Sequence, residues 1–432
     1  MQHPPFHRRV LLWVFVIMFL AVAPSAIFYT AGYRWNPKKG AIERNGTVII
    51  DTIPEGAKIT MNGTVLAKAS PVTQQDVAPG TYRIALTLSG YHPWEKVLDV
   101  RPERVTFVND VEFWPITTDP SAIDETSARA IETSPNGRYV AYVRNRNGEM
   151  GVSIIDSTNG KRSEYGFSTS TFSGIGQLEW SSDSSAVFVH DDHDVSWIVN
   201  RTGTRAISLP DGTYRWSGKD LVGVSAVGKT TYNTTSGAAS RTTLAKGVLD
   251  TEGVYDIVES VSSTALALRD RSDPNRLFEL PPGDWSFSTA PDGMIAVYQS
   301  GREVIFNGGT DPTSAAVVAS NSQIETLKMN GETSLLTVQA NEIWLSTLGS
   351  EPELLLRKSV PIRSAVWHRL GKNLFYASPT EVVALNLDSR DGRMETTLAQ
   401  FDEIFGIAVV KKNLYVSAKK QGTEGVWSVR IE

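Results

Sequence analysis

The sequence predicts an all-β protein with one N-terminal transmembrane helix, and three observations carry this prediction. One long apolar run occupies residues 10–29. Residues 46–115 contain short β-branched segments separated by turn sequences. From residue 129 onward a polar turn followed by a short apolar strand recurs, without a convincing amphipathic helical pattern. We therefore expect a helix, a small β-sandwich and a β-propeller, in that order.

The apolar run at residues 10–29 has the length and composition of a transmembrane helix. A helix needs about 20 apolar residues to cross the ~30 Å hydrocarbon core of a bilayer. Arg8 and Arg9 precede the run, and basic residues favour the cytoplasmic side of a membrane. We therefore expect residues 1–9 to form a cytoplasmic tail. The bulk of the chain is then extracytoplasmic, on a single-pass protein of the cell membrane.

A cleavable signal peptide is the alternative interpretation of this run. Residues 21–23 (Ala-Val-Ala) have the small-x-small form of a cleavage site, but Pro24 follows directly and disfavours cleavage there. A buried core helix fits less well, because the run is long, uncharged and preceded by arginines. We therefore predict a retained signal-anchor helix over residues 10–31.

Composition excludes several classes of site and partner. The chain has no cysteine, so it cannot form disulfides, thiolate nucleophiles or cysteine-ligated metal centres. Its formal net charge of −5 gives no basic patch of the kind that binds nucleic acid. The expected partners are the membrane and an envelope protein or glycan, without nucleic acid, and the sequence does not indicate an oligomeric state.

Residues 46–115 predict a small β domain organised by its turns. Residues 48–52 are rich in β-branched side chains and predict a strand, which the turn at residues 54–57 (Pro-Glu-Gly-Ala) ends. An Asn-Gly pair at residues 62–63 is a strong signal for a β-hairpin. Residues 82–88 alternate apolar and polar side chains, as a strand with one buried face does.

The order of these elements closely resembles the PEGA family, which is named after the tetrapeptide at residues 54–57. The shared features include the Asn-Gly turn, a Pro-Gly-x-Tyr turn at residues 79–82, and Gly-Tyr at residues 90–91 followed by an aromatic residue. Ser-Pro at residues 70–71 replaces the usual Thr-Pro of the middle loop. The resemblance implies a small all-β module of bacterial and archaeal surface proteins with a structural role. Within its turn, Glu55 is expected to face solvent.

The rest of the chain predicts a β-propeller. Its repeats are anchored at residues 133, 180, 216, 259, 289, 328, 367 and 409. A period of about 40 residues with about four short strands in each repeat is typical of propeller blades. The turns are similar to those of TolB-type and WD40-like periplasmic propellers, although no copy is complete. We predict a linker at 116–128 and a propeller over 129–432, with seven or eight blades, eight being favoured by the count.

Three tryptophans, Trp180, Trp216 and Trp367, recur at one position of the repeat. Because a blade buries its apolar faces against its neighbours, we expect these side chains in the core between blades. A carbohydrate-binding platform is the alternative. The last strand, at residues 426–431, is expected to help close the ring.

The sequence shows no recognisable catalytic motif. The nearest match to a Gly-x-Ser-x-Gly nucleophile elbow, at residues 223–228, misses the second glycine by one position. Residues 190–194 (His-Asp-Asp-His-Asp) have side chains that bind divalent metals, but they fall between two strands and a hairpin turn is favoured. Asp183 and Asp292 are carboxylates that a glycosidase would need, yet turn formation explains both. We therefore predict no catalytic, cofactor-binding or metal-binding residue, and no cofactor.

These observations favour a non-enzymatic, membrane-anchored envelope protein of a prokaryote. The PEGA-like module would serve as a spacer or adhesion unit, and the propeller as a platform for a protein or glycan partner. The alternative is a propeller-type carbohydrate-active enzyme, a glycoside hydrolase or lyase that uses carboxylates in the propeller funnel. A sensor is disfavoured, because nine residues before the membrane run are too few for a signalling domain.

Overall fold

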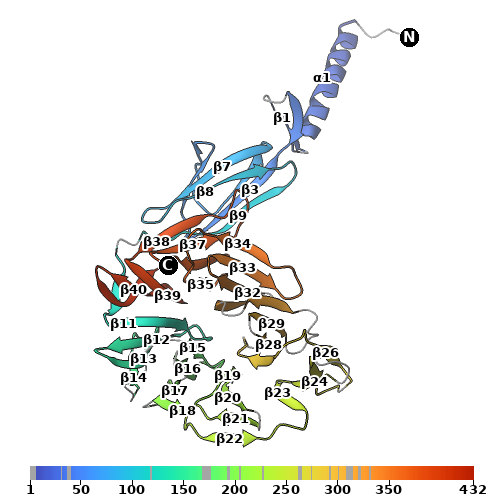
Figure 1. The fold of residues 1–432 in the computed structure, drawn as a ribbon. Coiled ribbons are helices and arrows are strands. Elements are labelled where there is room, and N and C mark those ends of the chain that lie inside the picture. The colour runs from blue at the N-terminus through green and yellow to red at the C-terminus, as the bar shows by residue number, and fades with distance from the viewer. Residues whose placement is uncertain are drawn as a thin grey trace. The chain divides into compact units, whose positions relative to one another are not determined.

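A computed structural model describes the chain except for fifteen short segments. These are residues 1–5, 31, 37–39, 117–118, 168–176, 192–194, 204–205, 226–227, 261–264, 274, 291–292, 300, 308–314, 320–322 and 330–331. The fold is mostly β-structure with one long helix (Figure 1). The chain divides into two compact units, one of residues 1–116 with 388–393 and the other of residues 117–387 with 394–432.

The helix α1 (Phe6–Thr30) begins the first unit and confirms the predicted apolar helix. Its segment Val10–Thr30 is long and apolar enough to cross a membrane, and none of its most apolar window is buried by the protein. Pro24 lies inside the helix without ending it. The exposed apolar surface therefore requires a lipid or protein environment outside this chain.

A short hairpin, β1 (Tyr33–Asn36) and β2 (Ala41–Arg44), joins α1 to the β domain of the same unit. The guanidinium of Arg44 lies 2.8 Å from the carboxylate of Glu103 and 4.6 Å from the centre of the Tyr33 ring. The main-chain N–H of Glu103 also donates to the carbonyl of Asn45, at 3.1 Å. The connection between helix and β domain is therefore a hydrogen-bonded element rather than a free linker.

The β domain is a sandwich of two sheets, with strand orders β6-β3-β9 and β5-β4-β7-β8. Buried and exposed residues alternate along β3 and β8, so each sheet turns one apolar face inward. At the predicted hairpin, Asn62 and Gly63 have φ of 45° and 82°, the two positive values that a type I′ turn needs. The strands are β3 (Gly46–Ile53), β4 (Lys58–Met61), β5 (Thr64–Val65), β6 (Val72–Val77), β7 (Gly80–Thr87), β8 (Trp94–Val100) and β9 (Val105–Glu112).

The tetrapeptide at residues 54–57 is held by Ser70, the residue at which the sequence departs from the PEGA pattern. The Ser70 hydroxyl accepts the N–H of Ala57 at 2.9 Å and lies 2.6 Å from the hydroxyl of Thr52. The carbonyl of Ser70 accepts the N–H of Gly56 at 2.8 Å. Glu55 is exposed, as expected for a turn residue. The serine therefore supplies the hydrogen bonds that fix this turn.

Residues 388–393, from late in the chain, also belong to this unit. The side chain of Lys96 on β8 is only 1% exposed. Its ammonium donates to the carbonyls of Asp388, Arg390 and Gly392 at 2.5, 2.9 and 2.9 Å. Burial lowers the pKa of Lys96, and the nearby carboxylate of Asp388 opposes this shift. All three donor positions of this buried ammonium are thus used.

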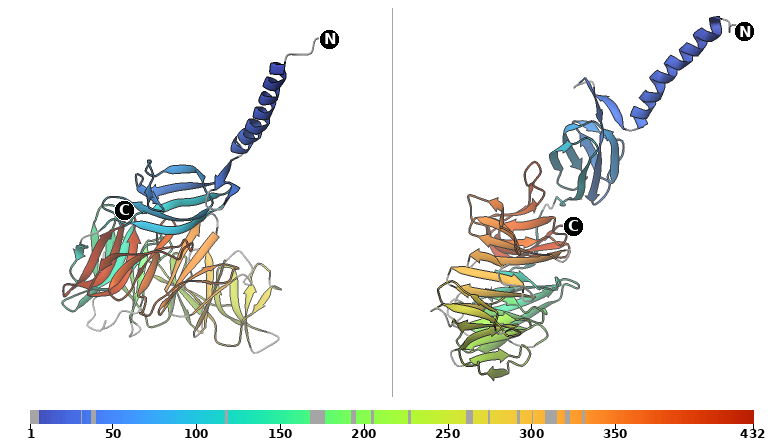
Figure 2. Two further views of the ribbon diagram at one scale, coloured as in Figure 1. Left: turned by 90° about the horizontal axis from the view of Figure 1, so that it is seen from above. Right: turned by 90° about the vertical axis from the view of Figure 1, so that its right-hand side faces the viewer.

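The second unit is a propeller of eight four-stranded antiparallel sheets within the described residues, which confirms the expected fold class and the favoured blade number. The blades follow one another around a ring, from green to red in Figure 1 and again in Figure 2.

Seven blades are continuous in sequence. Blade 1 is β11 (Ser127–Thr133), β12 (Tyr139–Arg146), β13 (Glu149–Asp156) and β14 (Arg162–Gly166); blade 2 is β15 (Gln177–Trp180), β16 (Ala186–His190), β17 (Ser196–Asn200) and β18 (Ala206–Leu209); blade 3 is β19 (Tyr214–Ser217), β20 (Asp220–Ser225), β21 (Gly228–Tyr232) and β22 (Ala239–Thr242); blade 4 is β23 (Val248–Glu252), β24 (Tyr255–Glu259), β25 (Leu266–Asp270) and β26 (Leu277–Glu279); blade 5 is β27 (Ser286–Ser288), β28 (Met294–Gln299), β29 (Arg302–Asn307) and β30 (Ala316–Ala319); blade 6 is β31 (Gln323–Met329), β32 (Glu332–Gln339), β33 (Glu342–Thr347) and β34 (Glu353–Arg357); blade 7 is β35 (Ser364–Trp367), β36 (Asn373–Ala377), β37 (Glu381–Asn386) and β38 (Glu395–Gln400).

Blade 8 closes the ring by combining both ends of the propeller segment. Strands β39 (Glu403–Val410), β40 (Asn413–Lys420) and β41 (Thr423–Arg430) are completed by β10 (Ser121–Asp124), which pairs with β41. The last strand thus helps close the ring, as predicted. The residues predicted as a linker, 116–128, instead contain β10 and the start of β11, because the short polar segment around Ser121 finds its partner only at the far end of the chain.

The three repeated tryptophans pack between blades, which confirms their predicted core position. Trp180 lies in a cluster shared by blades 1 and 2, and its indole N–H donates to the carbonyl of Glu132 at 3.3 Å. Trp216 lies between blades 2 and 3, and its N–H donates to the carbonyl of Glu179 at 3.3 Å. Trp367 lies between blades 6 and 7 and is 7% exposed. Adjacent blades therefore bury their apolar faces against each other.

Candidate functional site on the propeller axis

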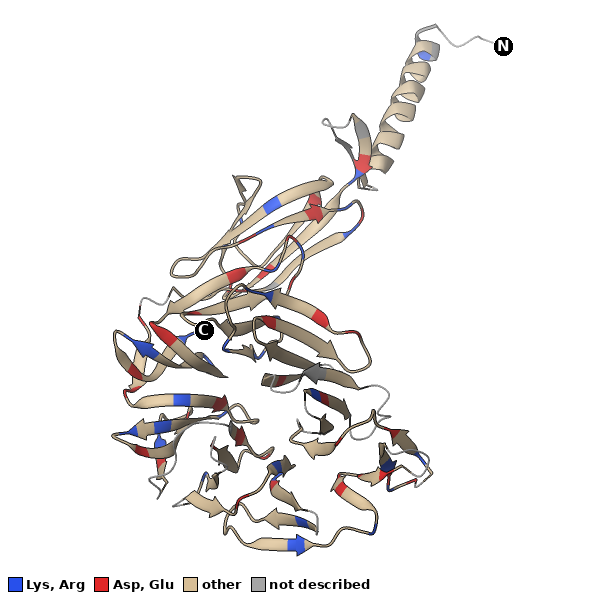
Figure 3. Ribbon diagram, in the orientation of Figure 1, with Lys and Arg blue, Asp and Glu red and all other residues tan. Residues whose placement is uncertain are grey.

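The innermost strands of blades 6, 7, 8, 1 and 2 contact one another in series around part of the axis. Strand β11 contacts β15 and β39, and β35 contacts β31 and β39, although all of these strands belong to different sheets (Figure 1). Lys, Arg, Asp and Glu are dispersed over the blades in Figure 3. Charged residues of the innermost strands can therefore meet across blade boundaries.

Around one part of the axis, Arg215 pairs with two carboxylates of the next blade, and Lys229 interacts electrostatically with both of them as a second cation. Its guanidinium donates to Asp250 at 2.9 Å and to Glu252 at 3.2 Å. The Arg215 and Asp250 side chains are only 7% and 6% exposed. Asp250 also accepts the N–H of Phe287 at 3.2 Å, and Glu252 accepts the hydroxyl of Ser217 at 2.5 Å. We call Arg215, Asp250 and Glu252 the paired cluster, since its buried charges are compensated within the chain.

Elsewhere on the axis, four glutamates approach one another without a basic partner. We call Glu132 on β11, Glu179 on β15, Glu303 on β29 and Glu325 on β31 the glutamate cluster. Glu132 is electrostatically coupled to both Glu179 and Glu325, and Glu179 is coupled to Glu303. No described Lys or Arg contributes to the electrostatics of any of the four. Carboxylates from blades 1, 2, 5 and 6 therefore share one weakly compensated region.

Three members of the glutamate cluster each accept a hydrogen bond from a neutral side chain. The donors are Thr289 Oγ1 to Glu179 at 3.0 Å, Ser288 Oγ to Glu303 at 2.5 Å and Gln323 Nε2 to Glu325 at 3.2 Å. Thr289 also accepts the main-chain N–H of Trp216 at 3.2 Å, so it connects blades 2, 3 and 5. These bonds orient the carboxyl groups but bring no positive charge to them.

Glu132 is the exception, because one of its oxygens has no hydrogen-bond partner. Its Oε2 atom is buried and unpaired within the part of the chain that the structure describes. An unsatisfied buried polar atom destabilises a fold by about 1–3 kcal/mol, and more when it is charged. The carboxyl group of Glu132 accepts the main-chain N–H of Trp180, and its Oε2 atom is enclosed with no partner among the described residues.

Burial raises the pKa of every carboxyl group in this cluster, and repulsion from neighbouring carboxylates adds to the rise for Glu132 and Glu179. Burial raises the pKa of Glu325 to about 7 against a weaker opposing effect of Gln323. The pKa of Glu132 lies well above its usual range because of burial and the neighbouring Glu179 and Glu325. Burial likewise raises the pKa of Glu179 and Glu303. Glu325 is therefore poised to gain or lose a proton near neutral pH.

Sequence reasoning missed both clusters, although the repeat contained a signal. Glu132, Glu179 and Arg215 each directly precede a repeat anchor, and they pair with Ala141, Phe188 and Val222 of the second strand of their blades. Most equivalent positions in the other repeats are apolar. Charged residues at a repeat position that is otherwise apolar could have indicated which side chains lie near the propeller axis.

Of the polar segment at residues 190–194, the structure describes His190, at the end of β16, and Asp191. The main chain of Asp191 and Val195 is paired across it, and the Asp191 carboxylate accepts the N–H of Val195 at 2.7 Å. The His190 ring lies 2.9 Å from the Ser196 hydroxyl. Residues 192–194 lie outside the described part. Among the described residues, no group of three His, Asp or Glu side chains is arranged to hold a metal ion.

The carboxylates considered for a glycosidase are not brought together. Asp183 accepts hydrogen bonds from the Ser181 hydroxyl at 2.8 Å and from the N–H of Ser185 at 3.0 Å, as a turn residue does. Asp292 lies outside the described residues. The carboxylates that do converge are the glutamates of the axis.

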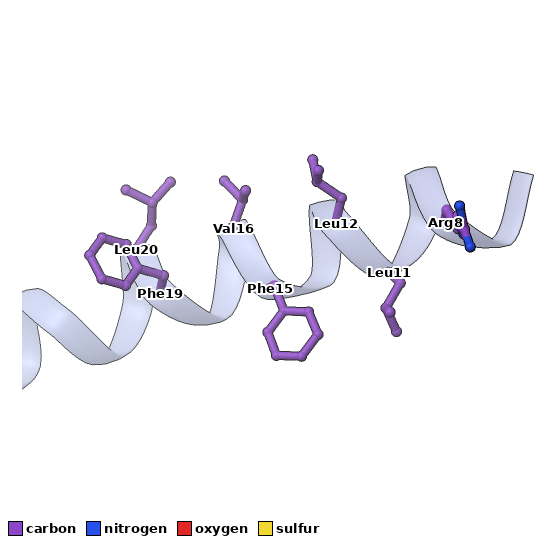
Figure 4. A pocket seen from close by; sticks show the side chains of 7 residues that line it. All are labelled: Arg8, Leu11, Leu12, Phe15, Val16, Phe19 and Leu20. Atoms are coloured by element: carbon purple, nitrogen blue, oxygen red, sulfur yellow. The ribbon is translucent and has the colours of Figure 1, made fainter. Parts of the chain in front are cut away.

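A concave surface runs along α1 in the other unit, and every side chain that lines it belongs to that helix (Figure 4). The lining consists of Arg8, Leu11, Leu12, Phe15, Val16, Phe19 and Leu20. A groove between neighbouring side chains of one exposed apolar helix is a packing surface for lipid or another helix. It offers no convergent polar groups for a small ligand.

Comparisons with known proteins support the module and report similar propellers. The PEGA domain family matches residues 45–112, which confirms the PEGA-like module for this part of the chain. No curated protein matches the sequence. Solved structures that align with it include the β-propeller domain of Cps50 (Swd1) from Myceliophteria thermophila, with 12% identity over 72% of this chain and 98% of that one and a TM-score of 0.42. Sqt1 from Saccharomyces cerevisiae aligns with 10% identity over 72% and 98% of the two chains and a TM-score of 0.43. The Dos1 propeller aligns with 13% identity over 71% and 94% and a TM-score of 0.43.

Proposed function

We propose that this chain is a non-enzymatic scaffold anchored in the cell membrane, whose propeller binds an envelope protein or glycan. The observation that carries the proposal is the order of parts along one chain. An exposed apolar helix continues through a hydrogen-bonded hairpin into a PEGA module, and a closed eight-bladed ring follows. The module then serves as a spacer or adhesion unit, and the propeller presents the binding surface.

The proposed organisation assigns residues 1–9 to the cytoplasm and residues 10–31 to the signal anchor. The module spans 46–115. The propeller follows outside the membrane, beginning at β10. Carboxyl groups on the innermost strands of blades 1, 2 and 6 support a binding role. The proposed partner is a protein or glycan of the envelope and not a nucleic acid, because the net charge is −5.

Membrane topology is testable by single-cysteine labelling, since the natural chain contains no cysteine. In intact cells, a membrane-impermeant maleimide should label Glu403→Cys, at an exposed position of blade 8, but should label Gln2→Cys only after lysis. The reverse pattern, or loss of the labelled protein from carbonate-washed membranes, would contradict the anchor. The wild-type protein, which has no cysteine, is the negative control for labelling.

The binding role is testable by photo-crosslinking the full-length protein in intact cells and identifying what is captured. A specific envelope protein or polysaccharide is the expected result. Turnover of polysaccharides or aryl glycosides by the purified full-length protein, abolished by one carboxylate substitution, would instead establish the carbohydrate-active enzyme.

A further inference from the structure

The hairpin that follows α1 brings the start of the β domain back to the end of the helix. The main-chain N–H of Gly32 donates to the carbonyl of Tyr29 at 3.2 Å, and the N–H of Asn45 donates to the carbonyl of Gly32 at 3.3 Å. The ring of Tyr33 also lies 5.4 Å from the ring of Phe28 in α1. Two main-chain hydrogen bonds therefore connect the last turn of the helix to the residue before β3.

The turn between β8 and β9, residues 101–104, is bonded to the same place. The N–H of Glu103 donates to the carbonyl of Asn45 at 3.1 Å, and the carboxylate of Glu103 lies 2.8 Å from the guanidinium of Arg44. Gly46 permits this close approach, because a Cβ atom there would lie 2.6 Å from a carbonyl oxygen of the turn. The turn is therefore fixed beside the end of α1.

This turn carries two arginines whose charges are not paired within the described residues. Arg101 and Arg104 are exposed, and neither guanidinium forms an ion pair with a described carboxylate. Glu103 lies between them in sequence, but its carboxylate is paired with Arg44. The turn therefore presents two guanidiniums to the surroundings from an ordered main chain.

The segment that joins the helix to the β domain has the same sign of charge. Residues 31–45 contain four Lys or Arg residues and one Glu, although the whole chain has a net charge of −5. Asp76 and Asp99 lie at nearby strand ends and offset only part of this charge. Basic side chains therefore remain in excess at the helix end of the β domain.

Exposed apolar side chains accompany the basic ones. Ile42 on β2 is 57% exposed, and Val105 and Phe107 on β9 are 44% and 48% exposed. Val105 and Phe107 share one face of β9, because alternate residues of a strand point to the same side. Basic residues beside exposed aliphatic and aromatic side chains are typical of surfaces that lie in the headgroup region of a membrane.

We propose that the turn at residues 101–104 is a second membrane contact, in which Arg101 and Arg104 bind the phosphate groups of anionic lipids. This inference rests on the proposed anchor, which places the end of α1 at the outer membrane interface. The hydrogen bonds described above hold the turn at that level. Guanidiniums fit phosphate oxygens, and the apolar side chains of Ile42, Val105 and Phe107 contact the lipid beside them.

Quenching of a site-specific label in nanodiscs tests this contact on the full-length protein, since the natural chain has no cysteine. Bimane on Pro102→Cys reports on the turn, and bimane on Glu55→Cys reports on the other end of β3, roughly 25 Å away at ~3.3 Å per residue. In nanodiscs with about 30% phosphatidylglycerol, a nitroxide on the lipid headgroup should quench the label at residue 102 about threefold more than the label at residue 55. Equal quenching at the two positions would overturn the contact.

Charge variants then test the role of the arginines. Arg101→Gln/Arg104→Gln keeps the main-chain hydrogen bonds of the turn and should lower quenching at residue 102 about twofold in anionic nanodiscs, but not in phosphatidylcholine nanodiscs. The matched control Lys58→Gln/Lys68→Gln removes two exposed positive charges near the other end of the module and should leave this quenching unchanged. High salt should reproduce the loss, because it screens exposed charges. Equal losses in the two variants would overturn the assignment to the arginines.

The remaining outcomes separate this inference from the proposed anchor. Wild-type protein that stays in the nanodiscs but is quenched equally with either lipid would reject the anionic-lipid contact and leave the anchor standing. Protein that does not stay in the nanodiscs would reject the anchor, and the contact with it. Loss of quenching on addition of inorganic phosphate at constant ionic strength would assign the arginines to a free anion and overturn the lipid assignment.

Discussion

The paired cluster and the glutamate cluster lie on the same ring of inner strands but differ in what compensates their charges. Arg215, Asp250 and Glu252 form a closed set of ion pairs within the chain. Glu132 and its neighbours have only neutral donors, and Oε2 of Glu132 has none among the described residues. The first arrangement supports the fold between blades 3 and 4. The second holds its carboxyl groups without a described cation, and burial raises the pKa of each of them.

Removing Arg215 should produce the largest loss of stability. The substitution Arg215→Met keeps an unbranched apolar stem but leaves Asp250, at 6% exposed, without its cation. Breaking a buried pair from one side destabilises by about 3–5 kcal/mol. Chemical unfolding followed by tryptophan fluorescence should show a correspondingly lower free energy of unfolding.

The double variant Arg215→Met/Asp250→Asn is the internal control for this prediction. It removes both charges, so its loss should be smaller than the sum of the two single losses by more than 1 kcal/mol, as coupled residues show. Additive losses would mean that Arg215 acts through packing on Phe287, whose ring centre lies 5.6 Å from the guanidinium, and not through charge.

Glu325→Gln, in contrast, is expected to raise the free energy of unfolding, and only at high pH. Burial raises the pKa of Glu325 to about 7 in the folded protein, so the folded state binds the proton more tightly than the unfolded state. Stability is then greatest below the unfolded pKa and falls as pH rises through about 7. At pH 8 the glutamine variant should be more stable than wild type by up to about 3 kcal/mol.

Urea unfolding at pH 4.5 and pH 8 measures this difference, which should vanish at the lower pH. The facing carboxyl groups Glu132, Glu179 and Glu303 shift in the same direction, so the wild-type slope has contributions from all four. Glu351→Gln is the control for removing one exposed charge. An equal gain in stability at both pH values would show that Glu325 is not protonated by its environment.

The sequence predicted the fold far better than it predicted the charged clusters on the propeller axis, and the reason is physical. Residues 54–57 and the Asn-Gly turn report local turns of the PEGA module, and the spaced tryptophans report burial that recurs with the propeller repeat. The pairing of β10 with β41 joins segments about 300 residues apart, and the short polar segment around Ser121 carries no sign of its partner. Glu132 and Glu325 likewise meet only because the ring closes. Single charges on separate blades become a cluster through topology, which periodicity does not reveal.

The smallest predicted effect separates two tryptophans that occupy the same repeat position. The indole N–H of Trp216 donates to the carbonyl of Glu179 at 3.3 Å, whereas that of Trp367 has no partner among the described residues. Trp216→Phe should therefore lose a hydrogen bond worth about 1 kcal/mol in addition to packing. Trp367→Phe loses packing alone and removes an unsatisfied N–H, so its destabilisation should be smaller by about 1 kcal/mol. Equal unfolding free energies for Trp216→Phe and Trp367→Phe would show that the hydrogen bond to Glu179 contributes nothing to stability. Both tryptophans would then stabilise the propeller through apolar packing only.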